Sequence, residues 1–216
     1  MKLSAEQKKV LVDALVYNYK HCANEYDLAM FEKKNVLQIL GNREYVLDHI
    51  DEIANGELLR TDYDAFHTFA TMCREYMASP AGRTENADDV QKIALIIRYS
   101  AKKTDAFDED YYKLTEEQKQ IVLRAFEAVS GKLEAMKGRL HYKAMKYYAK
   151  MNGTEDLLRR ADEIANDAEL EREEARAIKG ALNRYLKAVN RHNDPTKRGY
   201  IGITDEEKEI LETMVA

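Results

Sequence analysis

The 216-residue sequence has only two prolines and nine glycines, and it contains no tryptophan. An all-β protein needs Pro and Gly at its many turns, so their scarcity argues against that class. The two cysteines, Cys22 and Cys73, are too few for a disulfide scaffold, and we expect both to be reduced. The longest apolar runs, such as residues 93–97, are too short to cross a membrane.

The sequence also lacks a strong excess of either charge. It has 34 Lys and Arg against 39 Asp and Glu, a net charge of −5, and a pI of about 5.7. This mild acidity argues against a protein that binds nucleic acid over its whole surface. The first residues lead directly into a charged helix start and lack the apolar core of a signal peptide. We therefore expect a soluble, cytoplasmic protein.

Two segments of the first half recur in the second half. Residues 3–10, Leu-Ser-Ala-Glu-Gln-Lys-Lys-Val, resemble residues 114–121, Leu-Thr-Glu-Glu-Gln-Lys-Gln-Ile. Residues 51–55, Asp-Glu-Ile-Ala-Asn, return unchanged as residues 162–166. Both pairs have an offset of 111 residues (114 − 3 and 162 − 51). Because two matches at one offset are difficult to obtain by chance, the sequence predicts an internal duplication.

Apolar residues recur with α-helical spacing over nearly the whole chain. Ser4 with Gln7, and Thr115 with Gln118, have the spacing of a capping box at the start of a helix. These pairs lie in the two copies of the first repeated segment. The sequence therefore predicts that each half begins with a capped helix.

Glycine and asparagine pairs are expected to divide the long helical patterns. Gly41-Asn42 and Asn152-Gly153 should each end a helix, and Thr154 should cap the helix that follows. The first expected helix begins after Ser4, and the others cover about residues 24–40, 43–55, 62–78, 87–102, 115–151, 154–166, 171–191 and 204–215.

These patterns predict an all-α fold of about nine or ten helices. We expect two tandem, internally duplicated multi-helix units that pack as a pseudo-symmetric pair. The expected parts are a first helical repeat over residues 1–104, an acidic linker over residues 105–113, and a second helical repeat over residues 114–216 that carries a basic face.

Four side chains could ligate a metal ion if their two helices face each other: His49, Glu52, Asp64 and His67. Carboxylate metal sites in helical bundles use the order Glu-x-x-His, however, and His49-x-x-Glu52 reverses it. The offset of 111 also places Arg160 at the position of His49, so the second copy could not repeat the site. The sequence therefore predicts no metal site.

No motif for nucleophilic catalysis or nucleotide binding is present. The sequence has no Gly-x-Ser-x-Gly, no Gly-x-x-x-x-Gly-Lys-Ser/Thr and no Gly-x-Gly-x-x-Gly. A pair of acids from distant helices would leave no such signature, so catalysis is not excluded. With no positive sign of a reaction, the sequence favours binding over catalysis and predicts no cofactor.

The second half contains a basic face that could bind a partner. No Asp or Glu occurs from residue 135 to residue 154, and the lysines there recur on one side of a helix. The helix over residues 171–191 carries a second basic set opposite its apolar residues. The predicted binding residues are Lys132, Arg139, Lys143, Lys146, Lys150, Arg176, Arg184, Lys187 and Arg191.

The first half does not share this basic face. The counterparts of the five basic residues on residues 132–150 are His21, Leu28, Glu32, Asn35 and Ile39. A requirement of the fold alone would tend to appear in both copies, so the second copy has a surface of its own. Two interpretations remain open: a binding surface, or a solvated face whose lysines pair with acids elsewhere in the chain.

Tyrosine is unusually abundant, with 14 residues against five phenylalanines. Sequence neighbours such as Tyr147 and Tyr148 cannot both face one core from a helix, so some should be exposed. An aromatic ring with a polar tip is favoured at interfaces between proteins. The abundance of tyrosine is therefore consistent with a binding protein, and equally with tyrosines at helix boundaries.

Together these patterns favour a non-catalytic helical binding protein: an adaptor, regulator or inhibitor of another macromolecule. Another protein is the expected partner, and no membrane contact is expected. The alternative is a nucleic-acid-binding protein that uses the basic helices of the second repeat. A helical-bundle metalloprotein or enzyme ranks third. The sequence does not specify the identity of the partner or the oligomeric state.

Overall fold

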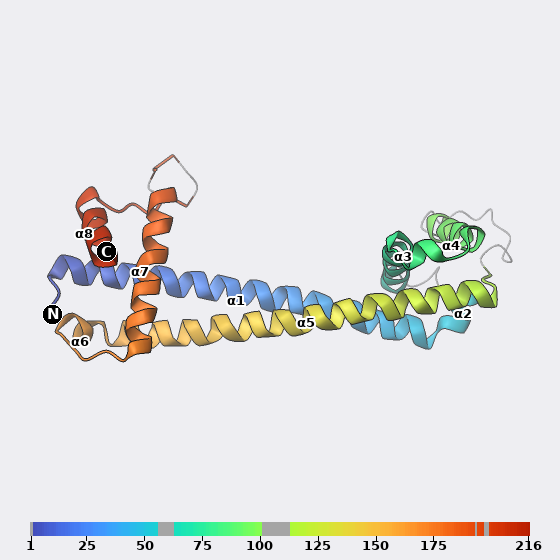
Figure 1. Cartoon of the computed structure of the whole chain (residues 1–216), viewed down its shortest axis with the longest axis horizontal. Coiled ribbons are helices and arrows are strands. Elements are labelled where there is room, and N and C mark those ends of the chain that lie inside the picture. The colour runs from blue at the N-terminus through green and yellow to red at the C-terminus, as the bar shows by residue number, and fades with distance from the viewer. Residues whose placement is uncertain (1, 56–62, 101–112, 193, 197–198) are drawn as a thin grey trace. The chain divides into compact units, whose positions relative to one another are not determined.

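The computed structural model describes residues 2–55, 63–100, 113–192, 194–196 and 199–216, with only the backbone for residues 63–66 and 96–100. Regular structure in these ranges is entirely helical, which confirms the predicted all-α class. The elements in order are α1 (Ala5–Asp48), α2 (Ile50–Ala54), α3 (Tyr63–Ala78), the 3-10 helix η1 (Gly82–Thr84), α4 (Ala87–Ser100), α5 (Glu116–Arg159), α6 (Ala161–Ala165), α7 (Arg172–His192) and α8 (Asp205–Val215) (Figure 1).

Helices α1 and α5 contain 44 residues each, and the predicted breaks at Gly41-Asn42 and Asn152-Gly153 are wrong. A glycine inside a helix costs only about 1 kcal/mol relative to alanine, which packing of flanking residues offsets. Thr154 lies inside α5, where its hydroxyl donates to the carbonyl of Lys150 at 2.7 Å, so it caps no helix. The described residues therefore form eight α-helices, fewer than expected.

The predicted capping boxes are confirmed at the start of both long helices. The amide of Gln7 donates to Ser4 Oγ at 3.1 Å, and the amide of Ser4 donates to Gln7 Oε1 at 2.9 Å. The amide of Gln118 donates to Thr115 Oγ1 at 3.3 Å, and the amide of Thr115 donates to Gln118 Oε1 at 3.0 Å. Each box satisfies backbone donors that a helix start leaves without partners.

The described chain divides into two compact units. Unit 1 comprises Met1–Met30 and His141–Ala216, and unit 2 comprises Phe31–Leu140. Each unit therefore combines a part of α1 with a part of α5. The predicted acidic linker, residues 105–113, lies outside the described residues except for Lys113.

Unit 1 is built from the first part of α1, the last part of α5, and helices α6, α7 and α8. One buried cluster joins α1 to α7 and α8 through Val10, Ala14, Leu182, Val189 and Leu211. A second cluster joins α1, α5, α6 and α7 through Leu11, Leu15, Leu157, Ile164 and Ala181. Burial of these apolar residues stabilises the packing of α7 and α8 against α1.

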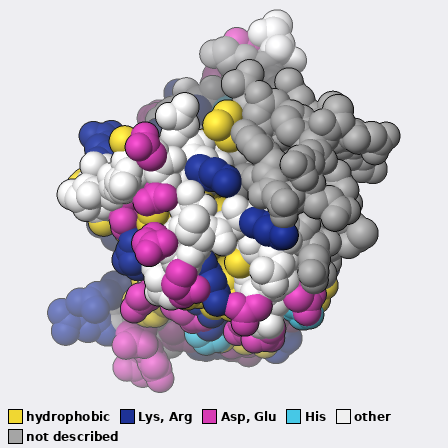
Figure 2. All heavy atoms as spheres, turned by 90° about the vertical axis from the view of Figure 1, so that its right-hand side faces the viewer, with side chains coloured by type: hydrophobic (Ala, Val, Ile, Leu, Met, Phe, Trp, Pro, Cys, Tyr) yellow, Lys and Arg dark blue, Asp and Glu magenta, His cyan; other side chains and the backbone are white. Residues whose placement is uncertain are grey.

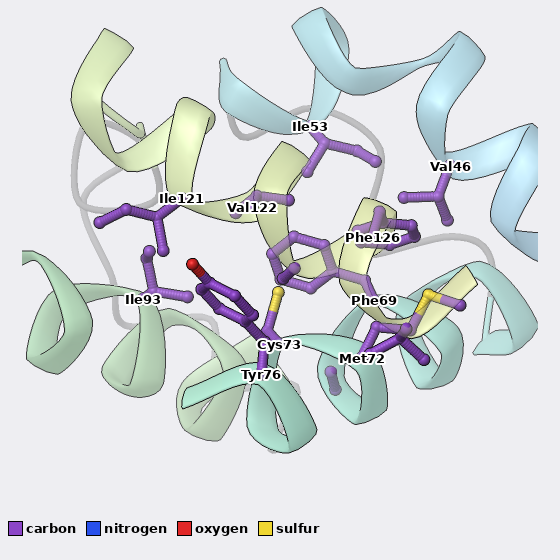
Figure 3. Packing of buried hydrophobic residues seen from close by; sticks show 13 residues of the cluster. Val46, Ile53, Phe69, Met72, Cys73, Tyr76, Ile93, Ile121, Val122 and Phe126 are labelled. Carbon is purple, nitrogen blue, oxygen red and sulfur yellow. The ribbon is translucent and has the colours of Figure 1, made fainter. Parts of the chain in front are cut away.

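Unit 2 has a larger core around two aromatic rings. Figure 3 shows side chains from α1 to α5 converging on Phe69 of α3 and Phe126 of α5. The centroids of the two rings are 6.4 Å apart, and both side chains are fully buried. Ile93 of α4 and Ile53 of α2 belong to the same cluster, so one core joins the described α-helical segments of unit 2.

The two units contain contacts of the same kind. In unit 1 the amide of Leu3 donates to the carbonyl of Ala165 at 2.9 Å, and Lys8 forms an ion pair with Asp162. In unit 2 the amide of Leu114 donates to the carbonyl of Ala54 at 2.8 Å, and Lys119 forms an ion pair with Asp51. In unit 1 the start of α1 thus binds α6, the short helix that follows α5. In unit 2 the start of α5 binds α2, the short helix that follows α1.

Charged side chains of both signs mix on the end of unit 2. Figure 2 shows acidic and basic side chains close together over the described part of this face. Within unit 2, Arg124 and Glu85 form an ion pair, with Arg124 Nη2 at 2.8 Å from Glu85 Oε2 and Arg124 Nε at 2.9 Å from Glu85 Oε1. Among the described helices, none has an apolar stretch long enough to span a membrane.

Candidate functional site

A trough of about 550 Å³ lies in unit 1 between the last part of α5 and α7, with Asn18 of α1 also lining it. Cavities of a few hundred to about 1,000 Å³ are typical of ligand-binding sites. The trough is lined by small, polar and charged side chains together. It is the candidate binding site.

Small residues on both helices keep the trough open. Ala149 and Gly153 are four residues apart on α5, and Ala177 and Gly180 are three residues apart on α7, so each pair shares one helix face. A Cβ atom added at Gly153 or Gly180 would meet no atom within 4 Å. The space beside these glycines would therefore accept atoms of a bound molecule close to the helix backbone.

A hydrogen-bonded cluster of polar side chains lines the inner part of the trough. The amide of Asn18 donates to Thr154 Oγ1 at 2.8 Å, and Arg184 Nη1 donates to Asn18 Oδ1. Asn18 and Thr154 are 8% and 3% exposed, so both groups have lost most of their contact with water. This cluster joins α1, α5 and α7 and fixes the direction of the Arg184 side chain.

Replacement of Asn18 by alanine is expected to lower the free energy of unfolding by about 1–3 kcal/mol, because it removes the partner of a partly buried guanidinium. Chemical denaturation followed by circular dichroism measures the change. Asn152, an exposed residue of α5 in the same unit, provides the control. Asn152→Ala should be neutral or slightly stabilising, and an equal effect of both substitutions would contradict the role of the cluster.

One end of the trough is cationic. Lys150 and Arg184 both line it, and in the described chain neither forms an ion pair with a carboxylate. The Lys150 Nζ lies 5.6 Å from the centroid of the Tyr147 ring, a favourable cation–π geometry. Burial, together with the nearby Arg184, lowers the pKa of His21 and so disfavours its charged form. The positive charge at this end thus comes from Lys150 and Arg184.

The other end of the trough is acidic. Asp156 of α5 and Glu173 and Glu174 of α7 line it, together with Glu171, which precedes α7. Glu174 forms an ion pair with Arg160 and accepts a hydrogen bond from the Glu171 amide at 3.1 Å. Arg176, three residues after Glu173, also lines this end, so acids predominate here but a cation is present.

The structure brings only some of the predicted basic residues together. Lys150, Arg176 and Arg184 line the trough. Lys143 is partly buried and forms an ion pair with Glu25 at 3.1 Å. Lys146, Lys187 and Arg191 are exposed in unit 1, while Lys132 and Arg139 are exposed in unit 2. The predicted face is thus divided between the two units.

Three of the four side chains suggested for a metal site are described: His49, Glu52 and His67. His49 Nδ1 is hydrogen-bonded to the carbonyl of Tyr45 at 2.8 Å, and the two rings are 4.3 Å apart between centroids. Glu52 is exposed, and the side chain of Asp64 lies outside the described residues. Among the described His, Cys, Asp and Glu residues, no three are placed to hold a metal ion.

Sequence reasoning missed the small and polar residues of the trough. Gly153 was expected to end a helix, and Gly180 and Asn18 were given no role in binding. The spacing of Ala149 with Gly153 and of Ala177 with Gly180 was the available signal. Its meaning depends on α5 and α7 lying next to each other, which the sequence alone does not reveal.

Comparisons with protein-family models, with curated proteins and with solved structures find no match for this chain.

Proposed function

We propose that this chain is a non-catalytic helical binding protein, an adaptor, regulator or inhibitor, and that the trough of unit 1 binds a segment of another protein. The observation that carries the proposal is the trough itself: about 550 Å³ of open space against two glycines, with charges of both signs in its lining. Backbone can approach backbone where side chains are absent, which suits a polypeptide segment.

The charges of the trough favour a protein over nucleic acid. Asp156, Glu171, Glu173 and Glu174 line it together with the cations Lys150, Arg176 and Arg184. Four carboxylates would repel a phosphate backbone, whose binding depends on an excess of Lys and Arg. A protein segment can carry both signs of charge and can complement both ends.

Nucleic-acid binding is the second candidate, favoured by the exposed Lys146, Lys187 and Arg191 of unit 1. Its sign would be an affinity that falls steeply with salt concentration. These three side chains lie outside the trough lining, so the two candidates make separable predictions.

The test begins with affinity purification from native lysate, with and without nuclease, and mass spectrometry of the proteins retained. A protein recovered in equal amount after nuclease is then purified and mixed with this chain. The proposal expects slower hydrogen exchange in residues 149–157 and 177–184 of the complex. Recovery that collapses with nuclease, or protection confined to other residues, would refute it.

We also propose that the chain arose by tandem duplication, with an offset of 111 residues. The support is the sequence matches together with the similar contacts within the two units. The Leu3–Ala165 hydrogen bond and the Lys8–Asp162 ion pair of unit 1 have counterparts in unit 2 at positions shifted by that offset. Helices α1 and α5 also have equal lengths.

An exchange of residues 3–10 with residues 114–121 in the full chain tests the duplication. Because both segments supply a capping box and an equivalent lysine, the free energy of unfolding should change by no more than about 1 kcal/mol. Replacing residues 3–10 by residues 205–212, which lack these matches, is the control and should cost more. Equal losses from the two changes would argue against equivalent segments.

A further inference from the structure

The charges at the two ends of the trough occur in opposite order along its two helices, while Arg176 lies beside Glu173 on α7. On α5, Lys150 precedes Asp156 by six residues, roughly 9 Å of helix. On α7, Glu173 precedes Arg184 by 11 residues, roughly 16 Å of helix. The two helices thus present their cations and acids in opposite sequence order.

Two contacts show that like charges meet at the same end. Arg160, one turn after Asp156, forms an ion pair with Glu174, so the end of α5 lies beside the first turn of α7. Thr154 and Arg184 both bind Asn18, so the middle of this stretch of α5 lies near the later part of α7. Lys150 and Arg184 both act electrostatically on His21 and Cys22, so they mark one end of the trough. Asp156, Glu171, Glu173 and Glu174 mark the other end, where they outnumber the single cation Arg176.

Both ends retain capacity for a ligand of opposite charge. Arg184 uses Nη1 for Asn18 and for a long contact of 3.9 Å with the sulfur of Cys22. Lys150 is exposed, with its Nζ near the face of the Tyr147 ring. At the acidic end Glu173 is exposed and forms no ion pair among the described side chains, whereas Glu174 is paired with Arg160.

We infer that the partner segment carries an acidic side chain and a basic side chain separated by a short stretch of small or apolar residues. The acidic side chain binds at Lys150 and Arg184, the apolar stretch passes Gly153 and Gly180, and the basic side chain binds at Glu173. This inference rests on the proposed function and adds the charge order of the segment. Complementary charges at both ends select against partners with charge of one sign.

Three labelled peptides of equal length test the charge order by fluorescence anisotropy with the full chain. They share a central run of alanine and leucine and carry glutamates at one end and lysines at the other, glutamates at both ends, or lysines at both ends. The dipolar peptide is expected to bind about ten-fold more tightly than either of the others, since each of those meets like charge at one end. A short single-stranded DNA serves as a polyanion probe.

Reversal of the acidic end provides the matched variant. The double substitution Asp156→Lys/Glu173→Lys should lower the affinity for the dipolar peptide about ten-fold. It should raise the affinity for the peptide with glutamates at both ends. Glu116→Lys/Glu117→Lys in unit 2 changes charge equally outside the trough and should leave all three affinities unchanged.

Equal affinities for the three peptides, binding of none, or tightest binding of the DNA would each overturn the inferred charge order. Hydrogen exchange of the native complex distinguishes a wrong charge order from a wrong proposed function. If the purified protein partner still protects residues 149–157 and 177–184 from exchange, the trough is a binding site and only the charge order is wrong. If that protection is also absent, the proposed function fails with it.

Discussion

Replacement of Phe126 by alanine is expected to lower the free energy of unfolding of unit 2 by about 3–5 kcal/mol. The side chain is fully buried, and its ring lies 6.4 Å from that of Phe69 between centroids. The surrounding cluster includes residues of α1, α2, α3, α4 and α5 (Figure 3). A cavity there would weaken the shared core on which these five helices pack.

Phe31→Ala is the matched control for this prediction, because Phe31 also belongs to unit 2 but its side chain is 63% exposed. Its loss should change the free energy of unfolding by no more than about 0.5 kcal/mol. Chemical denaturation followed by circular dichroism at helix wavelengths measures both variants. If the two substitutions cost the same, Phe126 does not occupy the core described above.

Replacement of Gly180 by leucine is expected to weaken binding of the protein partner about 30-fold or more, the size of a hot-spot loss. A Cβ atom added at Gly180 meets no atom within 4 Å, so a larger side chain there would extend into the trough and occupy space that the partner needs. The same substitution should stabilise the free protein by up to about 1 kcal/mol, because leucine has a higher helix propensity than glycine. Loss of binding would therefore accompany a gain in stability.

Gly138→Leu controls for the change in helix propensity. Gly138 lies in α5 with no atom within 4 Å of an added Cβ, but it belongs to unit 2 and does not line the trough. This variant should be stabilised to a similar degree and should keep the affinity of the wild type. Titration calorimetry measures the affinity. Equal affinities of the two variants would show that the partner does not bind in the trough.

Local signals in the sequence were sufficient to predict the all-α class and the starts of the two long helices. The capping boxes at Ser4 and Thr115 depend only on residues three positions apart, and both are present. The breaks at Gly41 and Gly153 were wrong because a preference of about 1 kcal/mol at one glycine is outweighed by burial along the rest of the helix. Packing, which decides such cases, is not visible in a local pattern.

The division into units and the trough could not be predicted from local patterns. Leu3 and Ala165, which form a backbone hydrogen bond in unit 1, are far apart in the sequence. The basic face was derived from one helix at a time, so it joined Lys132 and Arg139 of unit 2 to Lys150 of unit 1. It also gave no sign that Arg184 binds Asn18 of α1.

The central claim is that a partner protein occupies the trough of unit 1, and cross-linking from inside the trough tests it most directly. Both native thiols are buried, and burial raises the pKa of Cys73 to about 12, so a new exposed cysteine can be labelled selectively. A photoreactive benzophenone is attached to a new cysteine in two separate variants. Ala177→Cys places it inside the trough, and Ala135→Cys places it at an exposed position of unit 2. The account predicts cross-links to the partner from position 177 and none from position 135, and cross-links from position 135 alone would contradict it.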